Sequence, residues 1–146
     1  MSAVIHRPGE GERHAAGASD FLIKATSEDT GGTFFLSEAV IAPESPGPPP
    51  HWHEQLHDMF YVLEGTLTMQ LGEETHEAGP GTFVCVPPGV VHAFRNASDE
   101  PVRFLNFNTP GGFEHYMRDL AEAARSAPLQ EAVGRVASRY DIRFPT

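Results

Sequence analysis

The stretch that decides the fold runs from Gly47 to Gly65 and reads GPPPHWHEQLHDMFYVLEG. A second block, from Gly81 to Asn96, reads GTFVCVPPGVVHAFRN. Both blocks combine histidines with the glycines and prolines that mark turns between strands. If both blocks belong to one β-barrel, three imidazoles and one carboxylate can face a single interior metal ion. The two blocks therefore predict a metal site.

Three histidines are the first candidate ligands. His51 and His53 are separated by one residue, and alternate side chains of a strand share a face. Both imidazoles can therefore enter the barrel while Trp52 points outward. His92 arrives from the second block, directly after a turn rich in proline and glycine.

Two neighbouring residues are candidates for the fourth ligand. His57 and Asp58 are adjacent, so only one of them can face inward unless the strand carries a bulge. Counting back from the turn at Gly65 selects Asp58, and a one-residue change of register would select His57 as a fourth imidazole. Three imidazoles and a carboxylate suit one divalent transition metal ion, Fe, Mn, Ni, Co or Zn, and ligand type alone does not choose among them.

Short runs rich in β-branched and aromatic residues recur between turns, which predicts an all-β barrel or sandwich. We expect Glu64 and Gly65 to form a tight hairpin and residues 78–81 another turn. The expected strands are residues 34–42, 59–63, 66–71, 74–77, 82–86, 91–96 and 102–108.

The pattern becomes helical after Pro110. Apolar residues from Phe113 to Ala124 fall on one helical face, and Pro128 opens a second helix whose inward residues run to Tyr140. We expect this helical segment, about 112–140, to cover one end of the barrel or to help a dimer form.

Composition limits the class of protein. A chain of 146 residues with 40% hydrophobic residues fits one domain, residues 1–146. The formal net charge of −10 argues against nucleic acid and anionic membranes as partners. Met1–Glu10 shows no secretory signal, and the single cysteine, Cys85, is expected as a buried hydrophobe, so we expect a cytoplasmic protein. Residues 1 to about 20 are expected to be loosely held.

The two blocks resemble the two sequence motifs of the cupin superfamily. The second motif matches through Gly81, Pro87, Gly89, His92 and Asn96. The first matches at His51, His53 and Gly65, with two departures. Gly47 precedes His51 by three intervening residues where the family has five, and Asp58 stands where glutamate is usual.

The resemblance implies a double-stranded β-helix, or jelly-roll barrel, with its core at about residues 34–108 and the metal in its mouth. Two further stretches, Phe60–Gly65 and Thr109–Glu114, are similar to small one-domain cupins related to quercetin dioxygenases. Aspartate is one methylene shorter than glutamate, so its carboxylate is expected to fall roughly 1 to 1.5 Å short of the metal if the backbone stays in place.

Three functions follow from the resemblance as hypotheses. The first is a metal-dependent dioxygenase acting with dioxygen on a small aromatic or enolisable substrate, with Asp58 as the catalytic proton acceptor. The second is a non-oxidative isomerase, cyclase or lyase, and the third is a non-catalytic small-molecule-binding cupin. We expect a homodimer. The expected substrate-binding residues, which alternate toward the metal, are Phe60, Val62, Phe94 and Phe107.

Overall fold

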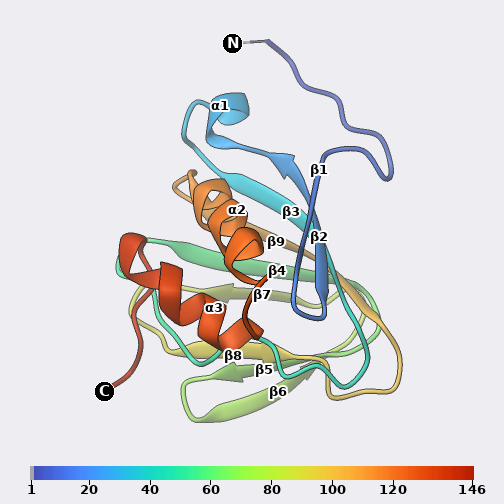
Figure 1. Ribbon diagram of the computed structural model, residues 1–146. Helices are drawn as coiled ribbons and strands as arrows, with labels where there is room; N and C mark the ends of the chain where they lie inside the picture. The colour runs from blue at the N-terminus through green and yellow to red at the C-terminus, as the bar shows by residue number, and fades with distance from the viewer. Residues whose placement is uncertain (1) are drawn as a thin grey trace.

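The computed structural model describes residues 2–146, so Met1 lies outside the described residues. The strands form a six-stranded sheet in the order β1-β2-β3-β9-β4-β7 and a three-stranded sheet in the order β6-β5-β8. The two sheets form a jelly-roll barrel with helices on one side (Figure 1), which confirms the predicted all-β fold with C-terminal helices. The strand bounds are β1 Glu12–Ala16, β2 Ser19–Ala25, β3 Phe35–Ile41, β4 His57–Glu64, β5 Leu67–Leu71, β6 Glu74–Ala78, β7 Phe83–Val86, β8 His92–Arg95 and β9 Val102–Thr109.

The seven expected strands correspond to β3 through β9, but the expected hairpin at Glu64 and Gly65 is wrong. β4 pairs with β7 and β9, whereas β5 pairs with β6 and β8, so Gly65 carries the chain from one sheet to the other. Gly65 has a φ of 78°, and a Cβ there would lie 2.5 Å from the carbonyl oxygen of Pro101. Glycine is needed because the crossing chain runs against this backbone.

The N-terminal stretch is more ordered than the sequence suggested. β1 and β2 form an antiparallel pair at the end of the six-stranded sheet, with Ala16 opposite Ser19. β2 buries Phe21 and Ile23 against the core. The expectation of a loosely held stretch through residue 20 is therefore wrong for the residues of β1 and the start of β2.

The helices lie where the sequence predicted them. α2 spans Phe113–Ala123 and buries Tyr116 and Leu120, while α3 spans Leu129–Val136 with Pro128 directly before it. Both lie together on one side of the barrel (Figure 1). A short helix, α1 (Ser27–Thr30), and a 3-10 turn, Ala137–Arg139, complete the described helical residues. The helices thus cover one opening of the barrel.

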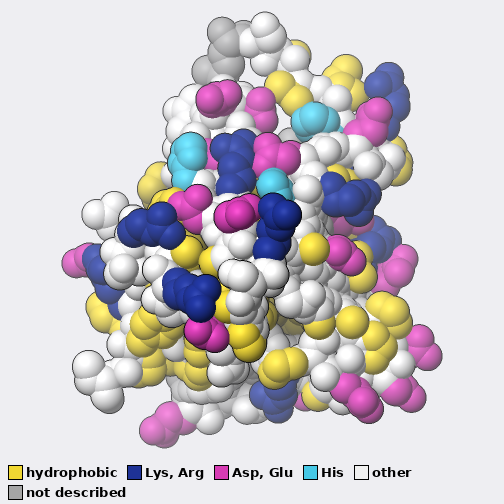
Figure 2. Space-filling model, in the orientation of Figure 1, with side chains coloured by type: hydrophobic (Ala, Val, Ile, Leu, Met, Phe, Trp, Pro, Cys, Tyr) yellow, Lys and Arg dark blue, Asp and Glu magenta, His cyan; other side chains and the backbone are white. Residues whose placement is uncertain are grey.

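The surface over the helices carries mixed charge. Figure 2 shows acidic and basic side chains interspersed on this face. Arg118 pairs with Glu12 at 2.8 Å, and Arg135 pairs with Glu131 at 2.9 Å. The face drawn there offers no continuous basic area of the kind that binds phosphate backbones.

One further expectation differs from the fold. Cys85 is exposed on β7, so the expected buried position is wrong: strand side chains alternate, and Val86 takes the inward position beside it. Among residues 2–146, no helix has the length and apolar character required to cross a membrane.

Candidate metal centre

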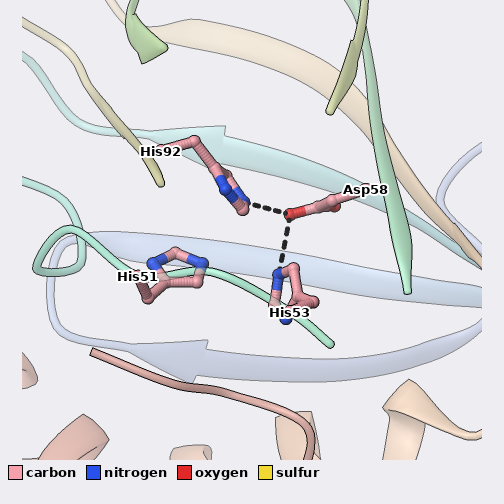
Figure 3. Close-up of side chains that lie close together, drawn as sticks. All are labelled: His51, His53, Asp58 and His92. Atoms are coloured by element: carbon pink, nitrogen blue, oxygen red, sulfur yellow. Dashed lines mark hydrogen bonds and ion pairs between the residues drawn. The ribbon is translucent and has the colours of Figure 1, made fainter. Parts of the chain in front are cut away.

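Three histidines and one aspartate meet inside the barrel (Figure 3). One nitrogen or oxygen of each lies within 4.8 Å of those of the other three. All four residues are buried, with His92 at 0% and His53 at 2% exposure. The residues are His51, His53, Asp58 and His92.

Backbone pairing brings the two sequence blocks together. The N–H of His51 donates to the carbonyl of His92 at 3.0 Å, and the N–H of His92 donates back to His51 at 2.8 Å. This bridge extends the three-stranded sheet beyond β8 and places two imidazoles side by side, with ring centres 4.5 Å apart.

The register of β4 decides between the two neighbouring candidates for the fourth position. Buried and exposed side chains alternate along this strand, and Asp58 falls on the buried positions while His57 is exposed. Asp58 therefore joins the cluster without a bulge, and His57 lies on the outer face of the sheet. The alternative with four imidazoles has no support in this register.

Each imidazole is fixed in the orientation that a metal ligand needs. Nδ1 of His51 lies 2.9 Å from the carbonyl oxygen of Pro49, and Nδ1 of His92 lies 2.9 Å from that of Val90. Nδ1 of His53 lies 2.6 Å from the carbonyl oxygen of Asp141. Because a carbonyl only accepts, Nδ1 of each ring carries a proton, and Nε2 is the nitrogen that faces the centre and that a metal would bind in place of a proton.

Asp58 is held by two amides from the neighbouring strand. Its Oδ1 accepts hydrogen bonds from Nδ2 of Asn106 at 2.8 Å and from Nδ2 of Asn108 at 2.7 Å. Its Oδ2 lies 3.0 Å from Nε2 of His92 and 3.4 Å from Nε2 of His53. The shorter aspartate therefore places one oxygen among the imidazoles, and the expected shortfall does not keep it away from them.

The electrostatics of the cluster favour an ionised carboxylate. Burial by itself raises the pKa of Asp58, but the interactions with His53 and His92 outweigh it and hold that pKa well below its ordinary value. Burial also lowers the pKa of His51 from 6.5 to about 4. At neutral pH the centre thus offers a carboxylate and a neutral His51.

The donor set fits a divalent metal ion. Nε2 of His53 is buried and forms no hydrogen bond in the described chain; its contact with Oδ2 of Asp58 is the longer ion pair of 3.4 Å, which leaves this nitrogen available to a metal. Metal–ligand bonds of about 2.1 Å place two donor atoms at most about 4.2 Å apart. The donor atoms of this cluster lie within 4.8 Å of one another, which is close to that limit. A small inward adjustment would complete a shell of three nitrogens and one oxygen.

The buried His51 predicts an acid-sensitive fold for the metal-free protein. Its pKa of about 4 lies below the ordinary 6.5, so the unfolded chain takes up its proton first as the pH falls. Between these two values His51 alone removes up to about 3 kcal/mol of unfolding free energy on acidification. We expect His51→Gln to flatten this part of the stability profile, measured by urea unfolding from pH 7 to 4.

His76→Gln, a substitution at an exposed histidine of β6 outside the cluster, is measured as the control. An equal slope in wild type and His51→Gln would contradict the assignment. The raised pKa of His53, where the pull of Asp58 exceeds the effect of burial, acts in the opposite direction and is common to all three proteins.

A cavity of about 90 Å³ opens from His51 and Asp58 toward the helices. Its wall is mostly apolar, and no lysine or arginine is among the described residues that line it. The residues that line it are Ala16, Ser19, Phe21, Ser37, Ala39, Pro48, His51, Asp58, Phe94, Phe104, Asn106, Phe113, Tyr116, Met117, Leu120, Leu129 and Ile142.

The four residues expected to bind substrate occupy three different places. Phe94 lines the cavity, whereas Phe60 and Val62 lie in the core at 0% exposure and do not line it. Phe107 stacks on the exposed Phe83 with ring centres 6.2 Å apart. The expectation that Phe107 faces the metal is wrong, because the inward positions of β9 belong to the even-numbered residues.

Several residues of this site were not predicted from the sequence. Asn106 and Asn108 alternate on one face of an expected strand, so their spacing was a usable signal. Met117 and Leu120 of α2 line the cavity, but only the packing of the helix on the barrel reveals that. Asp141 lies far along the chain from His53 and carried no local signal.

Fold and site together define a jelly-roll barrel whose mouth could hold a metal ion on three histidines and an aspartate. Residues 37–108 match the family model described as a cupin domain. The chain belongs to the cupin superfamily.

Three known proteins are similar to this chain in sequence or in fold. It is 32% identical over 114 residues to quercetin 2,3-dioxygenase from Bacillus subtilis, covering 78% of this chain and 33% of that protein. The polyketide cyclase RemF from Streptomyces resistomycificus superposes with a TM-score of 0.61 at 28% identity, covering 74% of this chain and 79% of RemF. KdgF from Halomonas sp. superposes with a TM-score of 0.68 at 16% identity, covering 78% and 99%. The chain therefore spans about a third of the length of the dioxygenase it matches.

Proposed function

We propose that residues 1–146 form one metal-dependent cupin domain that acts as a dioxygenase on a small aromatic or enolisable substrate. The observation that carries this proposal is the buried cluster of three histidines and one aspartate that opens onto an apolar cavity. The similarity to quercetin 2,3-dioxygenase supports the oxidative chemistry.

The cavity wall argues for the substrate class. With no lysine or arginine on it, a carboxylate or phosphate group of a substrate would have no protein cation as partner. Aromatic and aliphatic side chains such as Phe94, Phe104 and Met117 suit a flat, uncharged molecule instead. The volume of about 90 Å³ is below the ~300 Å³ of usual ligand sites, which favours a compact substrate.

In this proposal His51, His53, Asp58 and His92 hold the metal. When bound, a redox-active divalent metal would lower the pKa of a substrate hydroxyl and permit reaction with dioxygen. Oδ1 of Asp58 is committed to the two amide donors, so Oδ2 is the oxygen that faces the centre. Asp58 would accept the hydroxyl proton at Oδ2, while the apolar wall excludes water.

A non-oxidative reaction is the second candidate, because the polyketide cyclase RemF shares the fold at 28% identity. In that case the metal serves only as a Lewis acid for cyclisation, isomerisation or elimination. The third candidate is a cupin that binds a small molecule without turnover.

Oxygen uptake separates these candidates. Protein loaded with Fe, Mn, Ni, Co or Zn is mixed with a panel of small enols, phenols and flavonols, and dioxygen consumption and product mass are recorded. The dioxygenase proposal expects uptake with at least one redox-active metal and none with zinc. Turnover with zinc in the absence of dioxygen would favour the cyclase class, and tight binding without turnover would favour a binding protein.

We also propose a homodimer. Trp52 is half-buried and pairs with Arg143, so it does not present the outward surface first expected. The outer face of β4, β7 and β9 is the better candidate, because Tyr61 and Phe83 are 39% and 53% exposed there. Light scattering at working concentration tests it, and a monomer would contradict the proposal.

A further inference from the structure

A short segment after the last helix reaches the metal centre. We call this segment, Tyr140–Arg143, the C-terminal strap. The backbone carbonyl of Asp141 accepts the hydrogen bond from Nδ1 of His53 at 2.6 Å, across 88 positions of sequence. The strap lies outside residues 37–108, the part of the chain that matches the cupin family model.

The side chain of Asp141 binds the loop between two candidate ligands. Its Oδ1 accepts the backbone N–H of Glu54 at 2.7 Å, and its Oδ2 accepts those of Gln55 at 2.9 Å and Leu56 at 3.1 Å. These three residues are part of the link from His53 to Asp58. One residue therefore fixes both the ring of His53 and the loop that spaces it from Asp58.

The far end of the strap is tied down as well. The N–H of Trp52 donates to the carbonyl of Arg143, and the N–H of Arg143 donates to the carbonyl of Trp52, both at 2.8 Å. The strap thus runs along the chain on both sides of His53. Between these anchors, Ile142 is 4% exposed and lines the cavity that opens from the metal centre.

Hydrogen bonds of this kind decide how well a metal site is preorganised. A metal-ligating imidazole almost always donates its other ring N–H to a partner, which fixes the orientation of the ring and strengthens metal binding. The loop 54–56 is short and presents three N–H groups in one direction, and a carboxylate is the acceptor that can satisfy all three. Without it, the loop and the His53 ring would have more freedom, and metal binding would have to order them.

We propose that Asp141 is a positioning residue of the metal centre, and that its carboxylate sets metal affinity by holding the His53-to-Asp58 loop in the ligating conformation. This inference rests on the metal site of the proposed function. The carboxylate acts through His53 and the loop and does not itself contact the metal.

Asp141→Asn tests the proposal, because it turns one accepting oxygen into an N–H₂ group while keeping the backbone carbonyl that His53 uses. We expect the full-length variant to bind Co²⁺ about 10- to 100-fold more weakly than wild type, with an altered visible Co²⁺ spectrum. Arg143→Ala is the matched control. It removes the exposed 3.4 Å ion pair with Glu54, retains the backbone bonds of the strap, and should bind Co²⁺ as wild type does.

A second pair of variants applies if Asp141→Asn does not fold. Relative to Arg143→Ala, Arg143→Pro removes the backbone N–H that donates to Trp52 and also restricts the backbone of residue 143 and of Ile142 before it, so it should loosen the end of the strap and weaken Co²⁺ binding. Unfolding of the metal-free proteins is measured in parallel. A purely structural role would lower that stability while leaving the affinity and spectrum of the folded protein unchanged, and this result would overturn the proposal.

The outcomes separate this proposal from the proposed function. Equal affinity and spectrum in wild type and Asp141→Asn, or in Arg143→Pro and Arg143→Ala, would overturn the role of the strap and leave the metal site intact. Failure of wild type itself to bind Co²⁺ would overturn both.

Discussion

The His92→Ala protein is expected to bind Co²⁺ on the order of 100-fold more weakly than wild type. His92 is completely buried, and its Nε2 lies 3.0 Å from Oδ2 of Asp58 at the centre of the cluster. Structural Zn²⁺ sites bind their metal with about 10–16 kcal/mol. Shared equally among four ligands, this gives about 3 kcal/mol for each ligand, which corresponds to a loss of affinity on the order of 100-fold. Titration of metal-free protein with Co²⁺ measures the change.

His6→Ala is the control for this prediction, since His6 is exposed and far along the chain from the cluster. Its Co²⁺ affinity should equal that of wild type. Wild-type affinity in His92→Ala would mean that the metal binds elsewhere.

Phe60→Ala is expected to lower the free energy of unfolding by about 3–5 kcal/mol. Phe60 is 0% exposed on β4, and its ring centre lies 5.5 Å from that of Phe94 and 6.0 Å from that of Phe104. Truncation leaves a cavity that these rings cannot fill without moving. Urea unfolding of the metal-free protein measures the loss without a contribution from metal binding.

Phe34→Ala provides the comparison, because Phe34 is 38% exposed. This substitution should lower the free energy of unfolding by less than about 1 kcal/mol. Similar losses in the two variants would show that Phe60 is not part of a closely packed core.

Local patterns predicted the strands well, but they could not predict how the strands pair. Side chains alternate along β4, so Asp58 and His57 face opposite sides of the sheet. Counting back from Gly65 indicated that Asp58 is the one on the inward side. The same glycine was misread as a hairpin turn, because a turn within a sheet and a crossing between sheets need the same local geometry. β1 was not predicted from the sequence. Its residues, ERHAA, include charged side chains, and the rest of the fold buries only part of the strand.

The spacing of Asn106 and Asn108 places them on one face of a strand, but the ligands that the supporting residues contact could not be predicted, for a different reason. Asn106 and Asn108 contact Asp58 across a strand pair, and Asp141 contacts His53 from the end of the helical segment. These contacts depend on the three-dimensional arrangement, whereas ligand spacing is a local property of the two blocks. A sequence can therefore indicate the ligands of such a site before it indicates what holds them.

Metal content per chain is the measurement that tests the central claim most directly. Protein purified without an affinity tag is analysed for metals by elemental analysis, as wild type and as Asp58→Ala and His57→Ala. We predict close to one divalent transition metal ion per wild-type chain, unchanged in His57→Ala, whose side chain is exposed, and reduced or lost in Asp58→Ala. Wild-type protein that holds no metal and cannot be reloaded would contradict the account.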